Sequence, residues 1–313
     1  MATDTPQPAK NAPLLLLVLI TLLLGIGIGI ATPQGMIRSM ITKNTIKLPE
    51  QTAGTDLSTS YGKLQQEVVP AEGYTVRLDW GDTGGKLVEA GGIDLARYQE
   101  IYADEALRDE LSYLTGAKQG GITITPENAH FWVNTLWALG LSQQSDVLDN
   151  GIMGTQYKDT IGNFASTGGW TLGSKDAVTL YSSSAIIPLT ADQQRIVTEI
   201  SSNIYRPCCG NPTSFPDCNH GMAILGLVEL MVSQNFSEEE IYRAALAFNS
   251  YWFPQTYIDL AYFFQTTEQA PWRDVDAKRA LSKDFSSAGG YASVKQQIGT
   301  IPGNKTEGGS CSA

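Results

Sequence analysis

Three of the four cysteines in this chain lie within 11 residues of one another, and one of its two histidines lies beside them. The cluster comprises Cys208, Cys209, Cys218, His220 and Met222. Thiolate, imidazole and thioether groups are the ligands that soft metal ions prefer. The cluster therefore predicts a zinc site made by the three cysteines and His220, or a copper(I) site with Met222 as an additional ligand.

The same cysteines allow two further interpretations. Cys218 could form a disulfide with Cys208 or Cys209, which leaves the other cysteine as the attacking or the resolving thiol of disulfide exchange. All three would then be catalytic residues of a thiol–disulfide oxidoreductase. A single disulfide could instead staple the loop to the next helix in a structural or interaction protein. Adjacent cysteines are unusual for zinc, whose paired ligands are commonly a few residues apart. Metal binding is our first prediction, and whether the protein is an enzyme stays open.

Helix signals flank the cysteines on both sides. A capping box begins a helix at Thr190, and Pro207 ends it. Asp217 is a candidate N-cap for the next helix, which is apolar almost all round, and a second capping box follows at Ser237. We expect a Cys-rich loop on a helical hairpin, within a bundle that spans residues 189–250.

Several short matches in this bundle occur together. They are Arg206-Pro207-Cys208, Asp217-Cys218-Asn219, Ala223 and Ser237-Glu238-Glu239-Glu240-Ile241. With them the segment resembles the redox domain of the membrane-anchored thiol oxidoreductases of cytochrome c maturation, in which an R-C-x-x-C loop joins two helices of a three-helix bundle. Through Pro207-Cys208-Cys209-Gly210 it is also similar to the bacterial PCYCG-motif lipoproteins. The C-x-x-C spacing is absent here, but the resemblance implies an extracytoplasmic site with thiol chemistry at Cys208.

An uncharged run of 18 residues, Leu14–Ala31, precedes all of these elements. As a helix it is about 27 Å long, close to the thickness of a bilayer core. It predicts an uncleaved single transmembrane anchor after a short N-terminal tail, residues 1–13. The cysteines and the short tail favour a cell-membrane protein whose soluble domain lies outside the cytoplasm. The positive charges that follow the run would instead place the C-terminal side in the cytoplasm; they are Arg38, Lys43 and Lys47.

The remaining sequence predicts a mainly α fold. After the N-terminal transmembrane helix we expect a linker at 32–73, a mainly helical extracytoplasmic domain at 74–299 and a flexible tail at 300–313. Further helices are predicted to begin near Asp94, Pro126 and Pro254. The net charge of −11 argues against nucleic acid as a partner. The sequence has no glycine-rich phosphate-binding motif, so we expect no nucleotide cofactor. The expected partners are the membrane and a protein partner or disulfide substrate.

Overall fold

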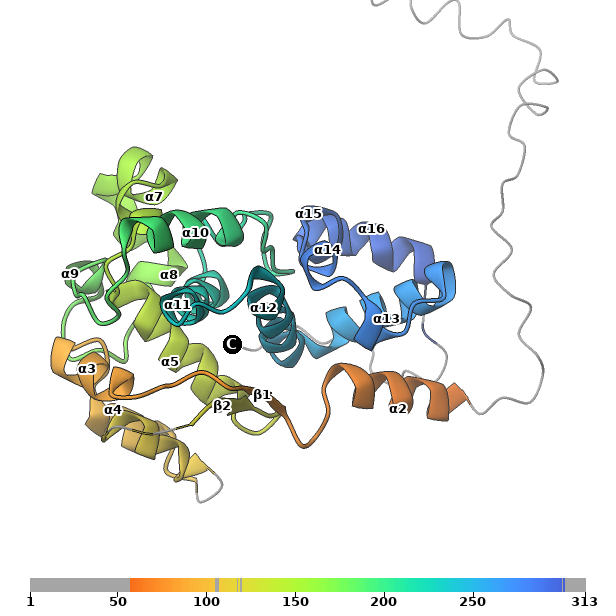
Figure 1. Cartoon of the computed structure of the whole chain (residues 1–313), viewed down its shortest axis with the longest axis horizontal. Coiled ribbons are helices and arrows are strands. Elements are labelled where there is room, and N and C mark those ends of the chain that lie inside the picture. Colours follow the sequence, from red (N-terminus) through yellow and green to blue (C-terminus); the bar gives the residue numbers. More distant parts are fainter. Residues whose placement is uncertain (1–56, 105–106, 117, 119, 300, 302–313) are drawn as a thin grey trace, which may run out of the picture. The chain divides into compact units, whose positions relative to one another are not determined.

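The structure, a computed structural model, describes residues 57–104, 107–116, 118, 120–299 and 301 (Figure 1). These residues belong to one unit of the chain, Ala53–Ala313. The predicted mainly α fold is confirmed for them. The helices of seven or more residues are α2 (Leu57–Val68), α3 (Thr83–Ala90), α4 (Leu95–Ile101), α5 (Ala129–Ser142), α10 (Ala191–Ser201), α11 (Asn219–Ser233), α12 (Glu238–Trp252), α13 (Pro254–Glu268) and α16 (Ala288–Ile298).

Shorter helical segments fill the connections between these helices. The short α-helices are α6 (Asp146–Asp149), α7 (Ile152–Gln156), α8 (Ala165–Gly168), α9 (Ala177–Leu180), α14 (Ala277–Ala280) and α15 (Lys283–Ser286). The 3₁₀ helices are η2 (Glu110–Leu114), η3 (Lys158–Asn163) and η4 (Trp272–Asp274).

Local sequence signals explain where the main helices begin. The Asp94 side chain accepts hydrogen bonds from the amides of residues 96 and 97 at the start of α4. Thr190 and Ser237 each form a complete capping box, at α10 and α12 respectively. Pro254 occupies the first turn of α13, where its missing N–H costs nothing. These predicted helix starts are therefore confirmed.

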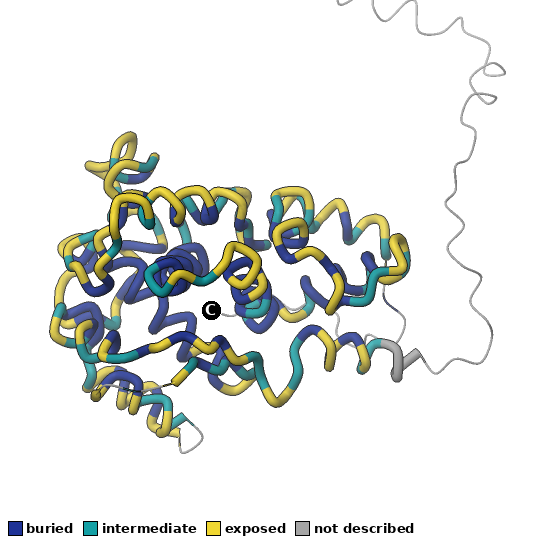
Figure 2. Tube along the Cα trace, viewed as in Figure 1, coloured by how far each residue is buried: buried dark blue, intermediate teal, exposed yellow. Residues whose placement is uncertain are grey.

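Helix α11 lies at the centre of the core. Every residue from His220 to Val232 is buried, as its apolar sequence predicts, and Figure 2 shows the helix as continuously dark blue. It packs against α5, α10 and α12, and α12 in turn packs against α13 and α14. Helix α13 contacts α16 and α2. The helix that follows the Cys-rich loop is thus fixed on three sides.

Helices α5 and α11 approach closely because glycines lie where they cross. A Cβ added at Gly140 would lie 2.1 Å from the Met222 carbonyl oxygen, and one added at Gly226 would lie 2.6 Å from the Leu136 carbonyl oxygen. Any larger residue at either position would push the helix axes apart. The backbone contact therefore fixes the position of the first turns of α11, which adjoin the cysteines.

A small antiparallel sheet pairs β1 (Tyr74–Val76) with β2 (Ile122–Ile124). Tyr74 pairs with Ile124 and Val76 with Ile122. Each strand has only three residues, which is too short for an alternating pattern to be recognised in the sequence. The pairing holds together two segments that are far apart in the chain.

Part of the predicted linker, 32–73, is helical. Helix α2 lies within it, and its buried residues Leu64 and Val68 join the main core. Within the described ranges, no helix has the length and apolar character needed to cross a membrane. The predicted tail 1–13 and anchor 14–31 lie outside the described residues, as does the predicted tail 300–313 except for the buried Ile301.

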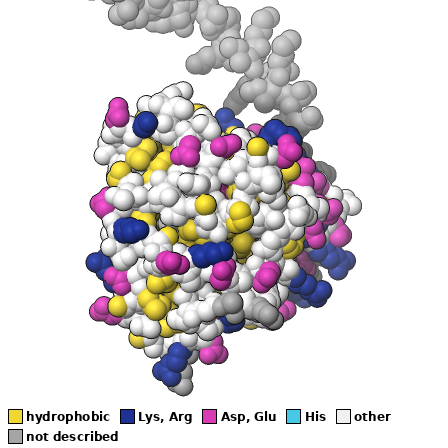
Figure 3. All heavy atoms as spheres, turned by 60° about the vertical axis from the view of Figure 1, so that its left-hand side comes forward, with side chains coloured by type: hydrophobic (Ala, Val, Ile, Leu, Met, Phe, Trp, Pro, Cys, Tyr) yellow, Lys and Arg dark blue, Asp and Glu magenta, His cyan; other side chains and the backbone are white. Residues whose placement is uncertain are grey.

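Charged side chains are distributed over the surface rather than concentrated. On the face shown in Figure 3, acidic and basic side chains are interspersed, with hydrophobic side chains between them. The net negative charge of the chain therefore does not form a single acidic patch on this face.

Candidate metal centre

The Cys-rich loop, residues 202–218, is folded back on itself between α10 and α11. The amide of Thr213 donates to the carbonyl of Ile204 at 2.8 Å, which closes the loop. Two further backbone hydrogen bonds tie it to the C-terminal helices, from Tyr205 N–H to Leu281 O and from Ala288 N–H to Cys209 O, both at 2.8 Å. The loop is thus held in place by segments that are distant in the sequence.

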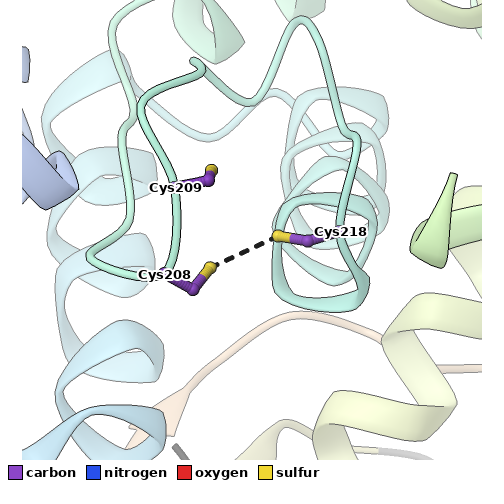
Figure 4. Close-up of side chains that lie close together, drawn as sticks. All are labelled: Cys208, Cys209 and Cys218. Carbon is purple, nitrogen blue, oxygen red and sulfur yellow. Dashed lines mark hydrogen bonds between the residues drawn. The ribbon is translucent and has the colours of Figure 1, made fainter.

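This folding brings the three cysteine sulfurs together. All three lie within 4.8 Å of one another, and the Sγ atoms of Cys208 and Cys218 are 3.4 Å apart (Figure 4). Cys208 is exposed, whereas Cys209 and Cys218 are partly buried. All three are free thiols, and they form a group that could hold a metal ion. The fourth cysteine, Cys311, lies outside the described residues.

A buried arginine lies against the sulfurs. The guanidinium of Arg206 is fully buried and donates from Nε to Cys218 Sγ at 3.0 Å. Nη1 donates to the carbonyl of Asn211 at 3.0 Å, and Nη2 donates to Asp217 Oδ1 at 2.6 Å. A buried charge is tolerated only when it is paired and its donors are satisfied, as they are here. Arg206 therefore supplies a fixed positive charge on the inner side of the cluster.

Gly221 makes room for this arginine. A Cβ added at Gly221 would lie 2.4 Å from Cζ and 2.5 Å from Nη2 of Arg206. Real Cβ atoms do not approach other atoms so closely, so only glycine lets the guanidinium lie against the first turn of α11. Neither role was predicted from the sequence. The signal present in the sequence was an Arg two residues before Cys208 and a Gly three residues after Cys218.

Asp217 does not cap α11 as the sequence predicts. The N-cap residue is Cys218, and both carboxylate oxygens of Asp217 are engaged within the loop. Oδ1 accepts from Arg206, and Oδ2 accepts from Nδ2 of Asn211 at 2.8 Å. The buried guanidinium is a stronger partner for the carboxylate than a helix amide, because both groups are charged. Asp217 therefore positions Arg206 rather than the helix.

The cluster favours a single thiolate at Cys218. Hydrogen bonds from Cys208 and Cys209, together with the charge of Arg206, hold the pKa of Cys218 well below its ordinary value, although burial opposes this. Hydrogen bonding to Cys209 and Cys218 raises the pKa of Cys208. Burial disfavours the charged form of Arg206, but the three neighbouring sulfurs outweigh burial and raise its pKa. One thiolate, two thiol donors and one cation thus form a connected network.

The other two predicted ligands lie elsewhere. His220 is not part of the group of side chains within 4.8 Å of one another. Its ring packs against Trp252, with centroids 5.6 Å apart, and against Phe253 at 4.4 Å. Burial lowers the pKa of His220 to about 4, and its Nδ1 has no hydrogen-bond partner. Met222 is fully buried in the hydrophobic core. The structure therefore brings together the three cysteines, but not His220 or Met222.

Helix geometry explains why His220 points away. Cys218 precedes the helix as its N-cap and has an extended backbone (φ −125°, ψ 165°), whereas His220 lies in the first helical turn and takes its direction from the helix. Cys218 projects toward the loop, and His220 then projects toward the end of α12. Met222 lies one turn further into the core.

Comparison with known proteins adds no identification. The chain matches no protein-family model, no curated protein and no solved structure.

Proposed function

We propose that this protein binds a soft metal ion, zinc or copper, through Cys208, Cys209 and Cys218. The observation that supports the proposal is the convergence of three sulfur atoms beside the buried cation Arg206. Three thiolates around one metal carry more negative charge than the ion neutralises. A positive charge fixed beside them offsets part of that excess.

The spacing of the sulfurs suits a single ion. With a metal–sulfur bond of about 2.3 Å, the sulfurs lie about 3.8 Å apart around a tetrahedral ion and about 4.0 Å apart around a trigonal one. The observed separations of up to 4.8 Å, and of 3.4 Å between Cys208 and Cys218, bracket both values. The sulfur separations therefore support the proposal of a single bound ion.

The proposal includes a membrane location. The apolar run Leu14–Ala31 would anchor the chain in the cell membrane, with residues 74–299 outside the cytoplasm. The length of the run supports an anchor, and the resemblance of residues 189–250 to extracytoplasmic thiol proteins supports the orientation. There the site would meet metal ions or thiol partners on the outer side of the membrane.

A second candidate is thiol–disulfide exchange, favoured by the 3.4 Å separation of Cys208 and Cys218 and by the exposure of Cys208. Because the cluster favours the thiolate at Cys218, the exposed Cys208 would first pass its proton to Cys218, whose Sγ is 3.4 Å away. The Cys208 thiolate would then attack a substrate disulfide, forming a mixed disulfide and releasing one substrate thiolate, which takes up the proton from Cys218. Cys218 would then attack the Cys208 sulfur, which forms the Cys208–Cys218 disulfide and releases the second substrate thiolate. The protein is oxidised by two electrons and the substrate disulfide is reduced by two.

The test is to purify the full-length chain without oxygen, count its free thiols, and measure bound zinc and copper. We expect about one ion per chain, lost in Cys218→Ser and retained in the matched control Cys311→Ser. Absence of metal with all loop thiols free would overturn the metal proposal. An oxidised loop that reduces and reoxidises with a disulfide substrate would establish the second candidate instead. An oxidised loop without turnover would leave a disulfide that only stabilises the fold.

A further inference from the structure

Among the described residues, no fourth cysteine, histidine or carboxylate joins the three sulfurs in a group within 4.8 Å. His220 is packed between Trp252 and Phe253. The two oxygens of Asp217 accept from Arg206 and Asn211. The loop carbonyl of Asn211 already accepts from Nη1 of Arg206 at 3.0 Å, and Cys209 Sγ lies 3.8 Å from it. The Asp217 carboxylate and the Asn211 carbonyl are therefore committed to Arg206 and to the loop, and the ring of His220 is held against aromatic side chains away from the sulfurs.

Arg206 lies against the cluster on the side of Cys218. Its Nε is 3.0 Å from Cys218 Sγ, and its other nitrogens bind the loop. The first turn of α11 closes over it at Gly221, where a Cβ would clash with the guanidinium. The guanidinium has donors only and remains protonated, so it cannot act as a metal ligand. Within the part of the chain that the structure describes, the cluster thus offers three sulfurs and a cation.

A fixed cation discriminates between ions by charge. Its repulsion of a bound metal is proportional to the charge of that metal, so a divalent ion is opposed twice as strongly as a monovalent ion at the same distance. Structural zinc sites in proteins are almost always four-coordinate, whereas soft thiolates also suit copper(I). Both the number of ligands and the charge beside them disfavour zinc relative to copper(I).

We propose that the site binds a monovalent soft ion, copper(I), with Cys208, Cys209 and Cys218 as its three ligands, and that Arg206 determines its preference over zinc. This inference rests on the proposed metal-binding function. Arg206 acts through its charge and its position, without touching the ion. The exposed Cys208 is the ligand through which the ion enters and leaves.

The test uses the full-length chain, reduced and free of oxygen. Copper(I) and zinc are each titrated against a chromophoric chelator, and the coordination of each bound ion is measured by X-ray absorption. We expect copper(I) bound by three sulfurs with no nitrogen ligand, and zinc bound more weakly. A sulfur–nitrogen shell around copper, or tighter binding of zinc, overturns the inference while metal binding itself stands. If the wild-type chain binds neither ion, the proposed function fails as well.

Two variants separate the roles of the neighbours. His220→Ala should leave the copper(I) affinity within about twofold of wild type, because His220 is outside the ligand set. A loss of tenfold or more would make His220 a ligand and overturn the inference. Arg206→Gln, which removes the charge, should raise the zinc affinity relative to copper(I) by at least about tenfold. An unchanged ratio in a folded Arg206→Gln variant would also overturn it. If that variant does not fold, the wild-type spectra and His220→Ala decide the outcome.

Discussion

Replacing Gly221 by alanine tests whether Arg206 is held against the first turn of α11. The added Cβ would lie 2.4 Å from Arg206 Cζ, so the guanidinium would have to leave its place. It would then lose its hydrogen bonds to Cys218, Asn211 and Asp217. Breaking a buried ion pair costs about 3–5 kcal/mol. Alanine is favoured over glycine within a helix by about 1 kcal/mol. The two effects together lower the free energy of unfolding by about 2–4 kcal/mol.

Gly85 provides the matched control. It is the third residue of α3, as Gly221 is the third residue of α11, but a Cβ at Gly85 meets no atom within 4 Å. Gly85→Ala should therefore leave stability unchanged or raise it by up to about 1 kcal/mol. Denaturant unfolding of the full-length chain, followed by circular dichroism, measures both variants. If Gly221→Ala is as stable as Gly85→Ala, Arg206 does not occupy the position described above.

Three further changes probe the scaffold. Glu229→Gln should raise the melting temperature at pH 7, because burial raises the pKa of this fully buried carboxyl and both of its oxygens lack hydrogen-bond partners. A carboxyl whose pKa is raised in the folded state contributes stability at low pH, and this contribution is lost as pH rises through the folded-state pKa. The increase in melting temperature caused by Gln should therefore shrink toward pH 4. A lower melting temperature at pH 7 would contradict this. Gly140→Val should lower the free energy of unfolding, measured with denaturant, by about 3 kcal/mol or more, because the valine side chain meets the Met222 carbonyl at the helix crossing. A near-neutral effect would exclude the close crossing of α5 and α11. Thr190→Ala should lower the free energy of unfolding by about 1 kcal/mol, because it removes the capping box of α10. An unchanged midpoint of denaturant unfolding would show that the cap contributes nothing to stability.

Helix positions were predictable because their signals are local. The capping boxes at Thr190 and Ser237 satisfy amide groups within three residues of the cap, so the sequence alone specifies them. The composition of α11, apolar almost all round, likewise required a central position. Helix α2 was missed because its apolar residues are widely spaced among polar ones, and packing against α13 and η4 gives them their partners.

The short strands were missed for a related reason. β1 and β2 have three residues each, and their pairing depends on contacts between segments separated by more than forty residues of chain. No local pattern specifies such a pairing, because the partner strand lies outside any window in which periodicity is measured.

The sequence by itself determined that three cysteines lie on or at the end of the loop between two helices and that one histidine follows at the start of the second helix. Proximity along the chain was enough to predict a cluster, because a loop of this length can fold its ends together. The tertiary structure decided which side chains share the cluster. His220 turned toward Trp252 and Phe253, because a helix fixes the direction of each residue it contains. Arg206 joined the sulfurs, because Gly221 leaves space for it. Side-chain direction and available space are properties of packed elements, and so they could be known only from the folded chain.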